Sequence, residues 1–200
     1  MPVTRSHVTR ALHLAILLII AHQLLGSLIM EPPLPGEDAE WPFKMHQGAG
    51  LAGLGALTLF WIWTLVRDRS ETSLASLFPW FDAASLRALF ADVASPLRRI
   101  ASGRWPSFEL PALASAVHGL GLALASFLAL TGSAWYFLAQ GTAYGKPLLG
   151  LHSLAGNLMW AYVIGHAAMG VAHQLGGDNV FSRMFWVRDG RAGLPLAPAE

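Results

Sequence analysis

Four stretches of this sequence are long and apolar enough to cross a membrane, and none contains Lys, Arg, Asp or Glu: residues 11–30, 46–66, 112–138 and 148–173. A bilayer core about 30 Å thick takes roughly 20 helical residues to cross. Lipid offers no hydrogen-bond partners to an open backbone, so each stretch should be helical. We therefore expect an all-α fold, a four-helix transmembrane bundle. The first stretch is longer than the apolar region of a signal peptide, and we expect it to be kept as a span.

The charges between these stretches indicate which side of the membrane each connection faces. The first connection has four acidic residues against Lys44, and the third has only Lys146. Arginines gather before the first stretch, in the second connection and near the end: Arg5, Arg10, Arg67, Arg69, Arg87, Arg98, Arg99, Arg104, Arg183, Arg188 and Arg191. Basic segments stay in the cytoplasm. We expect a multi-pass protein of the bacterial inner membrane with both ends of the sequence cytoplasmic.

The second connection contains a pattern typical of a short amphipathic helix. In "FDAASLRALFADV", apolar residues recur at helical spacing behind an expected N-cap at Asp82: Leu86, Leu89, Phe90 and Val93. We expect this helix to lie on the cytoplasmic lipid surface, although the same stripe suits docking of a soluble partner. Residues 1–176 are then expected to form one transmembrane domain, and residues 177–200 a cytoplasmic tail.

The composition excludes several kinds of function. The chain has no cysteine, which rules out disulfides, thiolate-held iron–sulfur clusters and covalently attached c-type haem. The net charge is only +1 and the basic residues form no single patch, so we expect no binding of nucleic acid. Eight histidines remain as the candidates for binding or redox chemistry.

The segment "HSLAGNLMWAYVIGH" places His152 and His166 fourteen residues apart in the fourth stretch. On a helix this spacing puts both imidazoles within about 40° of one face and about 21 Å apart, one near each membrane surface. His46 begins the second stretch level with His152, and His13 lies near the start of the first, level with His166. Two layers of paired imidazoles result, which suits a flat macrocycle with two axial nitrogen ligands. We expect two non-covalent b haems.

Other roles for these residues stay open. His118 is level with the His13/His166 layer; it can replace His13 as a ligand, but we expect it to line that haem pocket or a quinone site. Arg10 and Lys44 are candidates to pair with haem propionates. His22 lies about 180° round from His13, which leaves a face for another helix or for a homodimer. A zinc site would need three or four ligands clustered together, whereas these histidines are expected in pairs at opposite membrane surfaces. A transporter would be expected to have an intramembrane carboxylate, and none of the four stretches contains one.

Small and aromatic residues within the stretches are expected to have structural roles. Glycines in the second and fourth stretches suit close helix packing, or room for a porphyrin: Gly48, Gly50, Gly53, Gly55, Gly150 and Gly156. Tryptophans near the ends of the stretches are expected to anchor at the membrane interface: Trp41, Trp61, Trp63, Trp105, Trp135 and Trp160.

Two segments resemble a known family. "MHQGAGLAGLGALTLFWIWTLVR" and "GLHSLAGNLMWAYVIGHAAMGVAHQLGGDNVFSRMF" are similar to the second and fourth helices of the bacterial cytochrome b561 family, which includes the b-type subunits of nickel–iron hydrogenases. The resemblance covers all four helices. It implies that His13, His46, His152 and His166 ligate two haems, in agreement with the depth argument. The connection between the second and third helices is longer than in the smallest members of the family.

The resemblance also implies a function in electron transfer between the quinone pool and a redox partner protein. Ligation by two histidines leaves no open iron position, so oxygen chemistry at the metal is disfavoured. Whether the protein is itself an enzyme stays open. One alternative is a superoxide:ubiquinone oxidoreductase, and another is a haem-containing membrane anchor of a larger redox complex.

Overall fold

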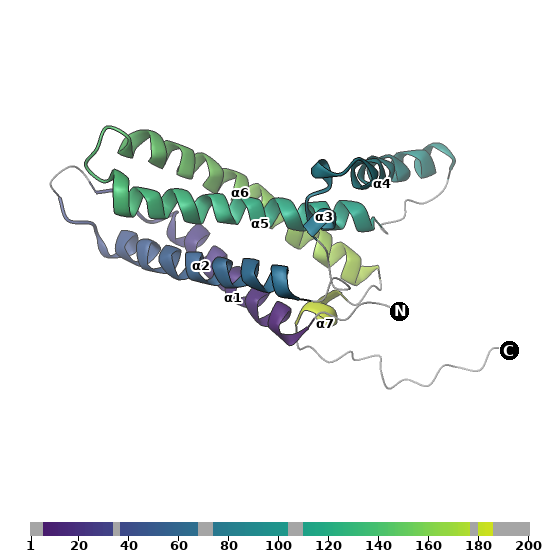
Figure 1. The fold of residues 1–200 in the computed structure, drawn as a ribbon, viewed down its shortest axis with the longest axis horizontal. Helices are drawn as coiled ribbons and strands as arrows, with labels where there is room; N and C mark the ends of the chain where they lie inside the picture. Colours follow the sequence, from purple (N-terminus) through teal and green to yellow (C-terminus); the bar gives the residue numbers. More distant parts are fainter. Residues whose placement is uncertain (1–5, 34–36, 68–73, 104–109, 177–179, 186–200) are drawn as a thin grey trace.

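In the computed structural model of the protein, which describes residues 6–33, 37–67, 74–103, 110–176 and 180–185, four long helices pack side by side (Figure 1). They are α1 (His7–Gly26), α2 (Trp41–Val66), α5 (Pro111–Ala134), which continues into the π-helical turn η2 (Trp135–Ala139), and α6 (Gly145–Leu175). Each is long and apolar enough to cross a membrane. The predicted all-α four-helix transmembrane bundle is confirmed.

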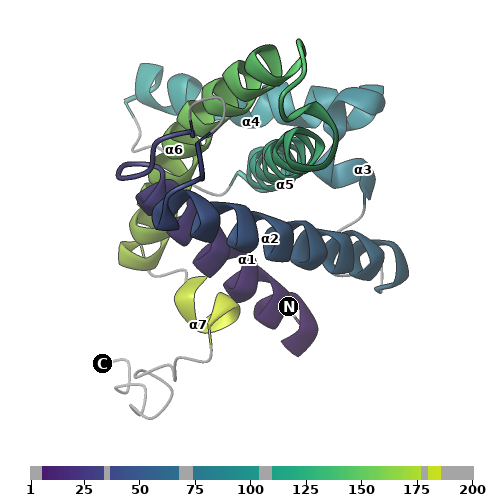
Figure 2. The ribbon, with the colours of Figure 1, turned by 90° about the vertical axis from the view of Figure 1, so that its left-hand side faces the viewer.

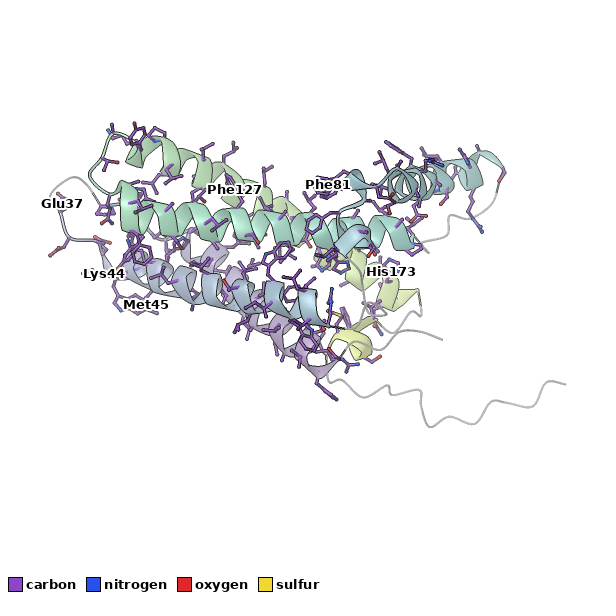
Figure 3. The ribbon with its side chains drawn as sticks, in the orientation of Figure 1. Glu37, Lys44, Met45, Phe81, Phe127 and His173 are labelled. Atoms are coloured by element: carbon purple, nitrogen blue, oxygen red, sulfur yellow. The ribbon has the colours of Figure 1, made fainter. Side chains whose placement is uncertain are left out.

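The bundle has two distinct ends. At the end that we call the loop end, α1 leads into α2 and α5 leads into α6, and Glu37 and Lys44 lie there (Figure 3). At the other end, the α4 end, α1 and α5 begin and α2 and α6 finish. His173 lies toward this second end (Figure 3).

Local capping sets where the long helices begin. Ser6 caps α1 because its Oγ accepts the Thr9 backbone N–H at 3.2 Å, so α1 begins four residues before the predicted span. The first turn of α5 is capped from a distance. Asp92 accepts the backbone N–H groups of Ala112 and Leu113 at 2.8 and 3.1 Å. A carboxylate there satisfies orphan donors and complements the helix dipole.

The shorter elements lie at the α4 end. They are α3 (Leu74–Leu77), the 3₁₀ turn η1 (Pro79–Phe81), α4 (Ala83–Ala101) and α7 (Val180–Met184). The predicted amphipathic helix is confirmed in α4, with Asp82 as its N-cap accepting the Ser85 N–H at 2.8 Å. This bond holds the pKa of Asp82 below its ordinary value. α4 lies crosswise to α5 (Figure 2).

The interior of the bundle is small. Its buried cluster joins all four long helices: Leu24, Leu57, Leu122, Ala125 and Met159. Several large apolar side chains of the long helices are strongly exposed, as they are when a helix faces lipid: Leu18, Leu59, Leu130 and Ile164. Gly50 and Gly53 serve helix packing, because a Cβ at either would meet Gln23 or Ile19 of α1 at 2.8 or 3.1 Å.

The prediction that the tryptophans anchor at the interface is correct only in part. Trp41 is 71% exposed at the loop end, as a belt residue should be. Trp61 instead donates its indole N–H to Ser126 of α5 at 2.9 Å, and Trp63 donates to Thr9 of α1 at 2.9 Å. Trp135 is buried. An indole N–H inside lipid needs an acceptor, and these helices supply one from a neighbour. Trp105 is outside the described residues.

Candidate cofactor site

The loop-end layer is formed by His46 of α2 and His152 of α6. Their ring centroids are 6.2 Å apart and the rings are nearly perpendicular, at 85°. An imidazole nitrogen binds a transition metal at about 2.0 Å, so two rings on opposite sides of one metal have centroids roughly 6 Å apart. The spacing between His46 and His152 would therefore let both rings hold one haem iron.

A hydrogen bond to α5 holds the ring of His152. The Thr131 hydroxyl lies 2.8 Å from the Phe127 carbonyl, and its Oγ1 lies 2.9 Å from His152 Nδ1. With the hydroxyl hydrogen on that carbonyl, Oγ1 would accept from Nδ1–H. The Nε2 lone pair of His152 is then available to a metal, the usual arrangement for a ligating histidine. Gly132 lets the ring sit against α5, since a Cβ there would lie 3.1 Å from His152 Cε1.

His46 is held by α1. Gln23 donates its side-chain Nε2 to the His46 carbonyl at 3.0 Å, which ties the two helices at this level. His46 Nδ1 is buried and has no hydrogen-bond partner. A ring nitrogen buried in this way is costly unless that nitrogen has a partner, and a metal bound at Nδ1 would supply one. His22 is exposed, as expected for a residue turned away from the His13 layer, and interacts electrostatically with His46.

An apolar cluster covers the loop-end layer. Phe43 and Trp135 are buried, with their rings 5.8 Å apart at 80°, and Leu148 packs against them. Phe43 precedes His46 by three residues, Trp135 follows Thr131 by four, and Leu148 precedes His152 by four. All three therefore lie on the loop-end side of the histidines. This cluster separates the layer from the nearer membrane surface.

The α4-end layer brings together three histidines. His118 of α5 and His166 of α6 are in ring contact, with centroids 5.1 Å apart at 83°, so the prediction that His118 is level with His166 is confirmed. His118 donates Nδ1–H to the Ala114 carbonyl at 2.6 Å. The separation of 5.1 Å is shorter than the roughly 6 Å expected across a metal, and it lies within the range of an edge-to-face ring pair. His118 therefore packs against His166.

His13 completes this layer from α1. It lies near both His118 and His166, and no ring contact joins it to His166 among the described side chains. Its Nδ1 is buried without a hydrogen-bond partner, as in His46. Its ring lies 6.1 Å from that of Phe185, just after α7. The stretch predicted as a tail thus contains α7 and contacts this layer, while residues 186–200 lie outside the described part.

A stacked tyrosine orients His166. The rings of Tyr162 and His166 lie 5.4 Å apart and almost parallel, at 8°. Gly121 of α5 makes this arrangement possible, since a Cβ at position 121 would collide with the Tyr162 phenol. The sequence alone did not single out Tyr162 or Gly121. The only signal was their position one helical turn from a candidate ligand.

The structure adds a third cation to the two that were predicted to pair with propionates. Lys44 is exposed and Arg10 is half-buried. Arg67, at the end of α2, is 8% exposed. It follows Trp63 by one turn, and Trp63 is bonded to Thr9, one turn before His13. A buried guanidinium on this side of the bundle is better placed than an exposed one to offset the desolvation cost of a buried haem propionate.

The histidine layers suit haem better than a clustered metal ion. Within the described part of the chain, no group of three or more His, Cys, Asp or Glu side chains is placed to hold a metal ion. The histidines instead come together in pairs from different helices, as at His46 and His152. The paired rings, the contact between Thr131 and His152 and the unpartnered nitrogens of His13 and His46 fit haem b.

An apolar four-helix bundle with facing histidines defines a membrane protein of the b-type haem class. The family model of prokaryotic cytochrome b561 matches residues 5–186. The chain belongs to this family, and it is therefore a multi-pass bacterial membrane cytochrome that binds haem b and functions in electron transfer. No curated protein and no solved structure gives a significant match.

Proposed function

We propose that this protein binds two b haems, one in each histidine layer, and carries single electrons across the inner membrane between the quinone pool and a redox partner protein. The observation that carries the proposal is the pair His46 and His152, whose ring centroids lie 6.2 Å apart with the ring planes nearly perpendicular. Haem, when bound, supplies a one-electron carrier that the side chains of the chain do not provide.

The second haem is assigned to His13 and His166. Both come from the helices that the family resemblance implies, and the buried Nδ1 of His13 has no hydrogen-bond partner. His118 satisfies its Nδ1 on its own helix and packs edge-on against His166. We therefore assign His118 the task of holding the His166 ring in place together with Tyr162. The two layers are fourteen residues apart on α6, about 21 Å along the helix.

The remaining part of the proposal concerns sidedness. The acidic first connection supports a periplasmic loop end, and the arginines around α2 and α4 support a cytoplasmic α4 end. The buried cluster of Phe43, Trp135 and Leu148 then keeps periplasmic water from the first haem layer. Electrons would reach that layer from a docked protein or from a carrier within the membrane.

This cover weakens the superoxide alternative. Superoxide is a small aqueous anion, and a site for it should be open and cationic. The loop end instead has Phe43 and Trp135 buried over the histidines, with Glu37, Asp38 and Glu40 close to Lys44 in the sequence. The anchor alternative differs from the main proposal in one respect: an anchor would keep its place in a larger complex without needing both haems to change redox state.

The first experiment counts haems and assigns them. The purified protein and four single variants are compared by pyridine haemochromogen assay and by reduced-minus-oxidised spectra: His152→Ala, His166→Ala, His13→Ala and His118→Ala. Two haems per chain are expected in the wild type and one in each of the first three variants. His118→Ala should keep both with an altered spectrum for one. His173→Ala, close to the end of α6, is the matched control and should resemble the wild type.

Two results would overturn the proposal. One haem in the wild type would remove the second site. Loss of a haem in His118→Ala with both retained in His13→Ala would transfer the ligand role to His118. If two haems are present, reduction by a ubiquinol analogue in proteoliposomes then tests the quinone part. Complete reduction by dithionite without any reduction by quinol would favour the anchor alternative.

A further inference from the structure

α4 has an apolar face that no part of the described structure covers. Phe90, Val93, Leu97 and Ile100 are 65%, 50%, 69% and 58% exposed. Their spacings of three, four and three residues place all four on one side of the helix. Just before α4, Phe81 is 85% exposed and Trp80 45%. In a soluble protein such a face would be an interaction surface.

The attachment of α4 to α5 sets its depth. Asp92 binds the N–H groups of Ala112 and Leu113, the second and third residues of the membrane span α5. α4 therefore lies where α5 enters the bilayer, and it runs crosswise to the span (Figure 2). At about 100° per residue, the centre of the apolar face lies roughly 120° from Asp92. The face thus points away from α5 and remains open.

Aromatic contacts hold the start of α4 against the bundle. Trp61 of α2 stacks on Phe78, with ring centroids 5.9 Å apart at 6°, and Phe78 meets Trp80 edge-on at 5.6 Å. Phe81 follows and lies at the junction between the bundle and α4 (Figure 3). Tethers at Phe78 and Asp92 fix two points along the segment. Its orientation is therefore set by the fold.

Two arginines flank the apolar face. Arg87 and Arg98 are eleven residues apart, which places them within about 20° of one another on the helix and about 16 Å apart. Both are exposed and lie on the side of the apolar face away from Asp92. An apolar face in the interface with arginines at its border is the arrangement that binds anionic lipid, since each guanidinium can reach a phosphate while its stem stays in contact with acyl chains.

We propose that η1 and α4 form an interfacial lipid-binding surface, with Phe81, Phe90, Val93, Leu97 and Ile100 inserted among acyl chains and Arg87 and Arg98 bound to headgroups of anionic phospholipids. Lipid binding by this surface is a function separate from electron transfer, and it does not depend on haem ligation. It commits α4 to the membrane, so a soluble partner docking on the same face is the competing outcome.

The absence of native cysteine allows a direct test on the full-length chain. A nitroxide label is placed at Leu97→Cys, on the apolar face, or at Ala88→Cys, which is exposed about 180° round the helix from Leu97. The protein is reconstituted in vesicles of phosphatidylcholine, alone or mixed with phosphatidylglycerol. Power-saturation electron paramagnetic resonance then compares collisions with oxygen, which concentrates in lipid, against collisions with a water-soluble nickel chelate.

The Leu97 label should show a several-fold higher oxygen-to-nickel ratio than the Ala88 label, and the ratio should rise further with phosphatidylglycerol. Adding Arg87→Gln and Arg98→Gln should abolish that further rise while leaving Leu97 in lipid. Equally low ratios at the two sites would place the apolar face in water and favour a soluble partner. A ratio at Leu97 that does not respond to phosphatidylglycerol would refute the binding of anionic headgroups by the two arginines. Each variant is first checked for wild-type haem content, which reports folding separately.

Discussion

Oγ1 of Thr131 on α5 lies 2.9 Å from Nδ1 of His152 on α6, and the same hydroxyl lies 2.8 Å from the Phe127 carbonyl. With its hydrogen on that carbonyl, the threonine would accept from Nδ1–H and leave the Nε2 lone pair of His152 for a metal bond. A partner of this kind orients a metal-binding histidine and raises its basicity. The contact would give α5 a part in holding the candidate ligand on the neighbouring helix α6.

Replacing Thr131 with valine should weaken binding of the loop-end haem. Valine has the same shape and offers no acceptor, so the His152 Nδ1–H is left unsatisfied in the interior. We expect haem affinity at this layer to fall about 10–100-fold, measured as faster haem transfer to apomyoglobin. Thr131→Ser keeps the hydroxyl and should behave nearly as the wild type. Equal transfer rates for the valine and serine variants would contradict this role.

Gly121→Leu should disturb the α4-end layer alone. The new side chain takes the space of the Tyr162 phenol, so the stack on His166 is lost. We expect one of the two haem signals in low-temperature electron paramagnetic resonance to shift or disappear, with the other unchanged. Gly55→Leu is the control, because nothing lies within 4 Å of a Cβ at that exposed glycine. Identical spectra for the two variants would show that Tyr162 does not orient His166.

Phe43→Ala should open the loop-end layer to water. Phe43 is 4% exposed, and its ring packs edge-on against Trp135 over His46. Truncation should destabilise the protein by about 3–5 kcal/mol and increase the rate at which aqueous ascorbate reduces the haem of that layer. Stopped-flow spectroscopy measures the rate, and Met45→Ala, at a position 41% exposed, serves as control. An unchanged rate would mean that the cluster does not limit access.

Met159→Ala should cost more stability than any lipid-facing truncation. Met159 is 1% exposed and lies seven residues from both His152 and His166, in the centre of the bundle. A cavity there should lower the free energy of unfolding by about 2–5 kcal/mol. Leu158→Ala, at a position 55% exposed, should cost much less. Thermal unfolding in one detergent compares them, and similar midpoints would show that the centre of the bundle is loosely packed.

Depth in the membrane could be predicted because helix geometry converts residue number into distance. A rise of about 1.5 Å per residue fixes the level of every residue once the spans are known. His46 is therefore opposite His152, and His118 is level with His166, as counting along the chain predicts. The predicted N-cap at Asp82 and the apolar stripe of α4 were likewise found, because both depend on neighbouring residues within one short segment.

Rotation of each helix about its axis could not be predicted in the same way. Lipid is as apolar as the interior of the bundle, so a span is apolar all round and its sequence does not mark the inward face. Thr131, Gly121 and Tyr162 looked like ordinary span residues, and Trp135 looked like an interface anchor, until packing turned them inward. The capping of α5 by Asp92, twenty residues upstream of Ala112, also required the folded arrangement.

The sequence by itself determined the helices, their order across the membrane and the levels of the histidines, because lipid forces helical backbone and helices have a fixed rise. The tertiary structure decided which side chains meet at each level. It faced His46 with His152, packed His118 against His166 and brought Phe185 onto His13. These contacts depend on how four nearly uniform apolar surfaces interlock, and that is a property of the packed bundle as a whole.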